Sequence, residues 1–473
     1  MSSIIKNLWK KSALEMISLL KNKEVSPREA LDSILSRIEE TNKDINAIVT
    51  ICEKRAIEKI EDLTPSLNNN PGFLHGLPIV IKDLTDVKGV KTTYGSTIYK
   101  NHVPTESDYL VQRIEYMGGI VIGKSNTPEF GAGSQTFNKV FGATSNPWNN
   151  NYTSGGSSGG TAAALAAGAA WLGTGSDLGG ALRNPASFCG VVGLRPTPGI
   201  VPHGPTNLPF DTLSVNGPMA RTVKDLSLFL DTMASYDYRD PISNASPKYS
   251  YQSAINANFG KLKIAFTDDY NILPCDSEVR SALDKSKSIF KNLGHSVYLD
   301  SPDFTDAENT FQVLRAHQLA KGKRELYINN KNLLKDDLRL NIEKGLSLTE
   351  DEISKAELSR GKIIKNINEF FKKYDLLVAP SSMVPPFSKE EYWPKKVENT
   401  FFDNYVSWLM TAATISLTGY PALAVPCAFS KNKLPIGIQI IAKPRNEHLL
   451  ISVGSQYQSG LDIKMSTPIN PIT

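Results

Sequence analysis

The stretch Leu77-Pro78-Ile79-Val80-Ile81-Lys82-Asp83 places a lysine directly after a short run of apolar, partly β-branched residues. A run of this kind predicts a buried β-strand. Lys82 then lies at the end of the strand, near or inside the core. An isolated lysine in such a place usually extends its amine to the surface. A buried amine is instead shifted toward its neutral form and can act as a base, which makes Lys82 a candidate catalytic residue.

Helical and strand patterns alternate on both sides of this strand. Residues 7–60 are predicted to be helical, since Ser26-Pro27-Arg28-Glu29 has the pattern of a capped helix start. A helix and then a strand are predicted over 107–126, and an alanine-rich helix over 161–170. Further strands are predicted over 262–268, 295–300, 375–380, 421–429 and 434–442, with helices over 277–293 and 304–374. The last two strands could form a hairpin.

This alternation predicts an α/β fold. The length of 473 residues alone corresponds to about three domains. However, no proline- or serine-rich linker divides the chain, and the predicted strands are too apolar to stand alone. We therefore expect a single large domain over 1–473, with residues 1–62 as an N-terminal helical segment packed on it.

Two glycine-rich segments are candidate binding loops. In Gly155-Gly-Ser-Ser-Gly-Gly160, Thr161 follows where a phosphate loop of the Walker type needs a lysine. The segment also satisfies the G-x-S-x-G pattern of a nucleophile elbow, but turn-forming residues precede it instead of a strand. Taken alone it could be a flexible linker. The second segment, 173–180, is predicted to be a loop whose Gly179-Gly180 pair offers adjacent backbone N–H groups to an oxyanion, or merely a tight connection.

The composition excludes several classes of protein. Lys and Arg total 52 against 48 Asp and Glu, and this net charge of +4 is scattered, so no nucleic-acid-binding face is expected. Cys52, Cys189, Cys275 and Cys427 lie more than 80 residues apart, which argues against a zinc ribbon and suits free thiols in a reducing cytoplasm. Neither a signal peptide nor a membrane span is expected, because the N-terminal apolar residues are interrupted by charges and the apolar stretch 162–173 is short.

Several segments in order along nearly the whole chain together resemble the amidase signature family. They are GLPIVIKD (76–83), GKSNTPEFG (123–131), NPW (146–148), GGSSGG (155–160), GSDLGGALRNPA (175–186), FCGVVGLRPT (188–197), PALAVP (421–426) and LPIGIQI (434–440). The resemblance implies one large domain with a central mixed β-sheet flanked by helices. It also implies hydrolysis of amide C–N bonds by a Ser–cis-Ser–Lys triad, without a metal or an organic cofactor.

The resemblance also assigns residues to roles. Lys82 is the expected base, Ser157 the bridging cis-serine, and position 181 the nucleophile. The oxyanion donors would be the backbone N–H groups of Leu178, Gly179, Gly180 and residue 181. Gly131 and Gly133 lie where the family's loop approaches the substrate, and Ser158, Asp177 and Arg183 are expected to support the site.

The chain departs from the family at the central position, because residue 181 is alanine and has no nucleophilic atom. One interpretation is a deliberate Ser→Ala change that traps bound substrate. A second is a natural pseudoenzyme or amide-binding protein, and a third is that Ser176 or Ser158 replaces the nucleophile. The first is favoured, because an inactive protein has no catalytic reason to keep Lys82 and Ser157 together.

Within the family, a stand-alone amidase competes with the amidase-type subunit of the tRNA-dependent glutamine amidotransferase. That subunit typically has Arg-Gln-Pro where this chain has Arg183-Asn184-Pro185, and the segment after Thr197 lacks its usual Tyr-Gly-rich stretch. We therefore expect a stand-alone, cytoplasmic hydrolase of a small-molecule amide, either a monomer or a homodimer. Candidate pocket residues are Phe130, Phe210, Tyr405 and Trp408, with His203 and His317 as possible polar contacts.

Overall fold

The computed structural model describes residues 5–63, 69–461 and 467–473. Within them, one sheet of 11 strands runs through the molecule in the order β1-β3-β2-β8-β10-β9-β16-β17-β13-β11-β12. Its strands are β1 (Ile48–Ile51), β2 (Pro78–Lys82), β3 (Ile120–Ser125), β8 (Leu172–Asp177), β9 (Val192–Arg195), β10 (Val215–Ala220), β11 (Lys263–Phe266), β12 (Ser296–Leu299), β13 (Leu376–Pro380), β16 (Ala422–Phe429) and β17 (Pro435–Ile441).

The sheet mixes parallel and antiparallel pairs. β2 lies parallel to both β3 and β8, and β11 lies parallel to both β12 and β13. Every pair between β8 and β13 is antiparallel. This arrangement confirms the predicted α/β fold with a central mixed sheet.

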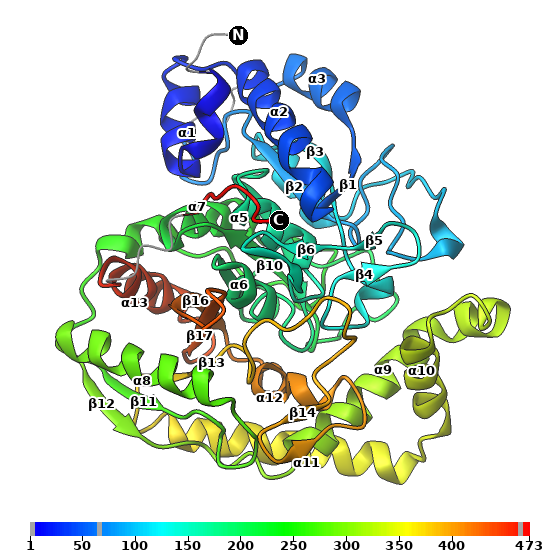
Figure 1. Ribbon diagram of the computed structural model, residues 1–473, viewed down its shortest axis with the longest axis vertical. Coiled ribbons are helices and arrows are strands. Elements are labelled where there is room, and N and C mark those ends of the chain that lie inside the picture. Colours follow the sequence, from blue (N-terminus) through cyan, green and yellow to red (C-terminus); the bar gives the residue numbers. More distant parts are fainter. Residues whose placement is uncertain (1–4, 64–68, 462–466) are drawn as a thin grey trace.

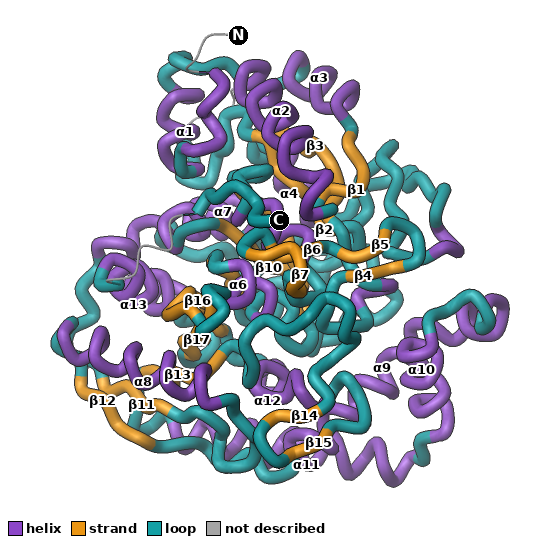
Figure 2. Tube along the Cα trace, in the orientation of Figure 1, coloured by secondary structure: helices purple, strands orange, loops and turns teal. Residues whose placement is uncertain are grey.

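Helices flank the sheet on both faces (Figure 1). They are α1 (Ala13–Lys21), α2 (Pro27–Ile45), α3 (Glu53–Glu61), α4 (Tyr109–Tyr116), α5 (Gly159–Ala166), α6 (Asn184–Cys189), α7 (Val223–Met233), α8 (Ser277–Asn292), α9 (Ala307–Asn330), α10 (Asp336–Ser347), α11 (Glu350–Phe370), α12 (Met410–Thr418) and α13 (Glu447–Ser459). Short two-stranded sheets are formed by β4 (Phe137–Asn138) with β5 (Gly142–Ala143), β6 (Ser145–Asn146) with β7 (Asn149–Thr153), and β14 (Lys396–Val397) with β15 (Thr400–Phe401). Figure 2 distinguishes these elements from the loops that join them.

Helix α5 passes through the core, and all of its residues are buried. Its sequence, GGTAAALA, has side chains small enough for close packing against the sheet. A Cβ added at Gly160 would lie 2.3 Å from the backbone nitrogen of Asn126, so only glycine fits there. The beginning of α5, which follows Ser157 and Ser158, is therefore fixed in the interior of the molecule.

The N-terminal segment is mainly helical, as predicted. The Ser26 hydroxyl accepts from the Glu29 backbone N–H at 3.2 Å, and the Glu29 carboxylate accepts from the Ser26 N–H at 2.8 Å, which completes the predicted capping box. The prediction is wrong at residues 48–51, which form strand β1. Tertiary pairing explains this, since β1 lies antiparallel along β3 and becomes the edge of the central sheet.

The prediction of a loop over 173–180 is wrong for its first half, because β8 runs to Asp177. Glycines usually weaken a strand, but these occupy crowded positions. A Cβ at Gly173 would lie 2.6 Å from a methyl group of Thr161, and one at Gly175 would lie 2.5 Å from a methyl group of Leu182. The glycines therefore let β8 pack closely against α5 and the loop that follows β8.

The second half of the chain follows the predicted order of elements. The predicted hairpin is confirmed, because β16 and β17 pair antiparallel from Ala422 opposite Ile441 to Phe429 opposite Pro435. The polar helical stretch over 304–374 divides into α9, α10 and α11. None of the helices in the described residues is long and apolar enough to cross a membrane.

We expect Gly345→Ala to destabilise the protein, because a Cβ there would lie 2.0 Å from the carbonyl oxygen of Ala316 in the neighbouring helix. Overpacking of this kind costs about 1–3 kcal/mol, and it is measured by urea or thermal unfolding. Gly361→Ala in α11 is the control, because nothing lies within 4 Å of its added Cβ. That change should stabilise by up to about 1 kcal/mol. Equal effects of the two substitutions would contradict the close contact of α9 with α10.

Candidate active site

Lys82 ends strand β2 and is completely buried. Its Nζ lies 2.7 Å from Ser157 Oγ, 2.8 Å from Ser158 Oγ and 3.0 Å from Ser176 Oγ. The lysine that the sequence places at the end of a strand therefore remains inside the protein, where three hydroxyl groups surround its amine.

The environment of Lys82 favours its neutral form. In the part of the chain that is described, no carboxylate lies within 4.0 Å of its amine. Burial lowers the pKa of Lys82 to about 7, although the negative charge of Asp177 acts in the opposite direction. Near neutral pH the amine can thus accept a proton from a neighbouring hydroxyl group.

Two of the serines that contact Lys82, Ser157 and Ser158, belong to the loop before α5, and the third, Ser176, belongs to β8. The Gly156–Ser157 peptide bond is cis, as the family resemblance implies. The hydroxyl of Thr136 donates to the carbonyl of Gly155 at 2.8 Å and accepts from the N–H of Gly159 at 3.1 Å, so it holds both ends of the loop. Ser157 faces the cavity described below, while Ser158 is fully buried beneath it.

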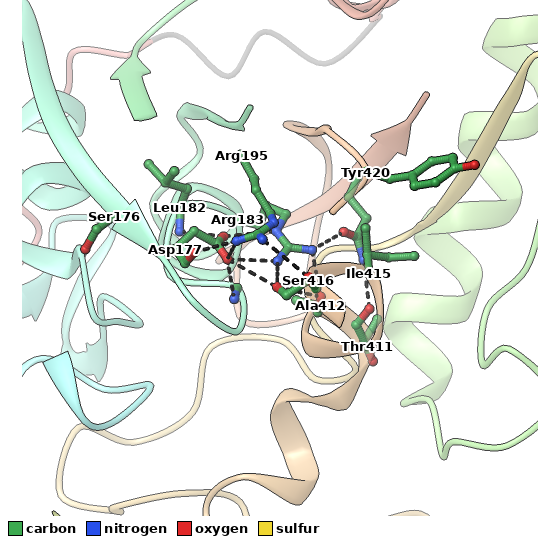
Figure 3. A network of polar contacts seen from close by, with 12 residues as sticks. Ser176, Asp177, Leu182, Arg183, Arg195, Thr411, Ala412, Ile415, Ser416 and Tyr420 are labelled. Atoms are coloured by element: carbon green, nitrogen blue, oxygen red, sulfur yellow. Dashed lines mark hydrogen bonds and ion pairs between the residues drawn. The ribbon is translucent and has the colours of Figure 1, made fainter. Parts of the chain in front are cut away.

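A second buried cluster fixes the loop that follows β8 (Figure 3). The Asp177 carboxylate forms ion pairs with Arg183 at 3.0 Å and with Arg195 at 3.2 Å. Burial alone would raise the pKa of Asp177, but the two guanidinium groups outweigh burial and hold that pKa well below its usual range. Arg183 also donates to the Ser416 hydroxyl and to the Ala412 carbonyl, both at 2.8 Å, which ties the loop to α12.

The backbone amides of this loop divide into two groups. The N–H of Gly180 donates to Asp177 Oδ1 at 2.8 Å, and Gly180 is buried. The predicted donation from Gly180 to an oxyanion would therefore compete with this carboxylate for the same N–H. Leu178, Gly179 and Ala181 are partly exposed and line the cavity, so their amides remain the candidate donors.

The two loops enclose a cavity of about 110 Å³. Ala181, Ser157 and Ser176 line it, so the residue at the predicted nucleophile position shares the cavity with two hydroxyls that contact Lys82. The other lining residues are Leu84, Phe130, Gly131, Ala132, Gly133, Ser134, Gly156, Leu178, Gly179, Ser214, Phe311, Arg315, Leu319, Tyr405 and Leu409. Gly131 and Gly133, with φ of +70° and +144°, lie at this cavity as the sequence suggests.

The other candidate pocket residues fall in different places. Phe130 and Tyr405 line the cavity, whereas Phe210 and His317 line a separate surface pocket. Trp408 is buried in the core, and His203 donates its backbone N–H to Asp240. Neither Trp408 nor His203 lines the cavity.

Sequence reasoning missed the contribution of α9 to the cavity. Phe311, Arg315 and Leu319 recur every four residues, so they share one face of that helix. The periodic spacing was the available signal, but it does not reveal which part of the sheet this face covers. No three His, Cys, Asp or Glu side chains among the described residues gather so that they could hold a metal ion.

A buried lysine contacts a cis serine at one end of a mixed sheet, and a glycine-rich loop lines the same cavity as that serine. The amidase family model matches residues 29–451, and the chain belongs to the amidase signature family. Enzymes of this family hydrolyse the C–N bonds of amides.

Similar proteins include acylamidases and subunits of glutamyl-tRNA(Gln) amidotransferases. An acylamidase from Rhodococcus erythropolis is 31% identical over 458 residues, which cover 96% of each chain. One glutamyl-tRNA(Gln) amidotransferase subunit, from Sulfurihydrogenibium sp., is 32% identical over 481 residues, covering 96% of this chain and 97% of that protein. The crystal structure of a bacterial aryl acylamidase superposes with a TM-score of 0.88 at 27% identity, covering 95% of this chain and 96% of the other.

We expect Asp177→Asn to lower the free energy of unfolding by about 3–5 kcal/mol, because two buried guanidinium groups would lose their carboxylate. Denaturant unfolding measures the change. Glu369→Gln is the matched control, since its pair with Lys372 at 2.8 Å is solvent-exposed and should contribute nothing measurable. A loss below about 1 kcal/mol for Asp177→Asn would show that the cluster does not hold the fold.

Proposed function

We propose that this chain carries the machinery of a stand-alone amidase that works through a serine acyl-enzyme, and that Ala181 makes it a catalytically inactive form. The observation that carries the proposal is the 2.7 Å contact between Lys82 Nζ and Ser157 Oγ at the cavity that Ala181 lines. Lys82 would be the base and Ser157 the bridging relay.

The reaction follows from these contacts once a serine stands at 181. Neutral Lys82 takes the Ser157 proton while Ser157 takes the proton of the attacking hydroxyl, so one proton moves from nucleophile to amine. The new C–O bond forms and the carbonyl π electrons move to oxygen. Return of the proton through Ser157 to the leaving nitrogen accompanies cleavage of the C–N bond. Water then repeats the attack on the acyl-enzyme and releases the carboxylic acid.

The oxyanion of this reaction would be bound by the amides of Leu178, Gly179 and residue 181. Oxyanion donors that are fixed before the reaction contribute roughly 3–4 kcal/mol each in known enzymes. The ion pairs of Asp177 support this role indirectly. They hold the glycine loop in place while Leu178, Gly179 and Ala181 stay partly exposed at the cavity.

A stand-alone enzyme is favoured over the amidase-type subunit of an amidotransferase by the Arg183-Asn184-Pro185 segment. Sequence identity alone does not separate the two, at 31% and 32%. Copurification with a second protein chain, or activity that depends on glutamine, would reverse this choice. We also place the protein in the cytoplasm as a monomer or homodimer, and the four cysteines, all free thiols, agree with a reducing compartment.

The first functional test introduces the hydroxyl. Ala181→Ser should raise the hydrolysis rate of a panel of aryl and aliphatic amides by at least about 10³-fold over the unmodified chain. Adding Lys82→Ala to Ala181→Ser should remove the gain. If Ala181→Ser folds and remains inert on every amide, the catalytic proposal fails, and an amide-binding pseudoenzyme or a partner-dependent amidotransferase takes its place.

The second functional test is the pH profile of Ala181→Ser. A base must be neutral to accept a proton, and the pKa of Lys82 is lowered to about 7. We therefore expect kcat/KM to increase about tenfold per pH unit below pH 7 and to level off above it. A profile that is flat between pH 5 and 9 would contradict the assignment of Lys82 as the base. Circular dichroism across the same range controls for unfolding.

A further inference from the structure

The cavity beside Ala181 carries a single charged side chain among its described lining residues, and that side chain is Arg315. The other lining residues are glycines, serines, and apolar or aromatic side chains. No carboxylate belongs to this lining, so the cavity presents a net positive charge to whatever enters it. This charge has no role in the acyl-transfer steps above.

Arg315 is only 6% exposed, and its hydrogen-bond partners are neutral. One Nη donates to Asn341 Oδ1 at 2.6 Å, and the other donates to the hydroxyl of Tyr405. Within the described ranges, no carboxylate lies within 4.0 Å of its guanidinium group, unlike those of Arg183 and Arg195. Neutral partners orient the guanidinium group, and no carboxylate of the described residues forms an ion pair with it.

A second cation lies next to the same cavity. Lys335 Nζ is 3.1 Å from the position that a Cβ on Gly133 would take, and Gly133 lines the cavity. The amine lies over the rings of Phe137 and Tyr405, at 5.3 and 5.9 Å from their centroids. Burial lowers the pKa of Lys335, and the nearby carboxylates of Asp337 and Glu129 act in the opposite direction. The Glu129 carboxylate also accepts from the Ser96 hydroxyl at 2.6 Å and from the backbone N–H of Lys335 at 2.7 Å.

A nearly buried cation without a carboxylate is unfavourable, whereas a guanidinium group paired with a carboxylate forms strong, oriented hydrogen bonds. A substrate that brings its own carboxylate would compensate this charge and would be held in one orientation. A cationic substrate would instead be repelled. We infer that the amide substrate of this site carries a carboxylate, which Arg315 binds.

This inference rests on the proposed amidase function, but its first test needs no catalysis. The unmodified chain, with Ala181, is titrated calorimetrically with succinamate, glutaramate and adipamate, and with the neutral butanamide, pentanamide and hexanamide. We expect at least one carboxylate-bearing amide to bind at least about tenfold more tightly than its neutral counterpart of equal length. Equal or weaker binding of all three anionic amides would overturn the inference.

Variants then locate the preference. Arg315→Gln should reduce the anionic-to-neutral affinity ratio to about one, whereas Arg315→Lys should retain part of it. Lys344→Met removes an exposed cation from the adjacent helix α10 and should leave the ratio unchanged. A purely structural role of Arg315 would weaken both classes of amide equally, and that outcome also overturns the inference. If Arg315→Gln does not fold, the affinity ratios of Arg315→Lys and of the unmodified chain still test the inference.

Hydrolysis by Ala181→Ser separates this inference from the proposed function. If that variant hydrolyses anionic and neutral amides with equal kcat/KM, the amidase proposal stands and the inferred carboxylate specificity fails. If it hydrolyses neither but the affinity ratio persists, the anion site stands and the proposed reaction fails. If the anionic-to-neutral ratio of kcat/KM agrees with the ratio of affinities, and Arg315→Gln abolishes both ratios, the result supports the anion site and the proposed reaction together.

Discussion

The shared carboxylate of Asp177 is the interaction on which the arrangement of this site depends. It compensates two buried guanidinium groups and also accepts from the backbone N–H groups of Gly180 and Leu182. Arg183 extends the cluster to α12 and, through Gln439, to β17. One carboxylate thus joins four separate segments of the chain, and it fixes which amides of the glycine loop remain available at the cavity.

Sheet topology brings this cluster close to the lysine. β2 and β8 run parallel, with Val80 opposite Gly173, so Lys82 and Asp177 both end their strands at the same edge of the sheet. Asp177 raises the proton affinity of Lys82, and burial lowers it by more. Burial therefore sets the pKa of Lys82 at about 7, while Asp177 is paired with two arginines and forms no ion pair with the lysine.

The sequence predicted those parts of the molecule that local rules determine. The strand before Lys82, the capping box at Ser26 and the hairpin of β16 and β17 follow from nearby residues alone. Local rules did not predict strands β1 and β8. Pairing with β3 overrides the local signal in β1, and close packing of Thr161 and Leu182 against the glycines of β8 overrides it there. The sequence could not place Arg315 at the cavity either. Helix α9 lies far along the chain from the glycine-rich loops, and only the order of the strands in the sheet brings them together.

Alanine at position 181 leaves the proposed site without a nucleophilic atom, while other contacts hold that site in place. Lys82 is positioned by its strand and three hydroxyls, Ser157 by its loop and Thr136, and the glycine loop by Asp177. None of these contacts requires a hydroxyl at 181. A buried amine without a carboxylate reduces stability compared with an apolar side chain of similar size. The proposed acyl transfer gives a reason for a lysine beside Ser157 that folding alone does not supply.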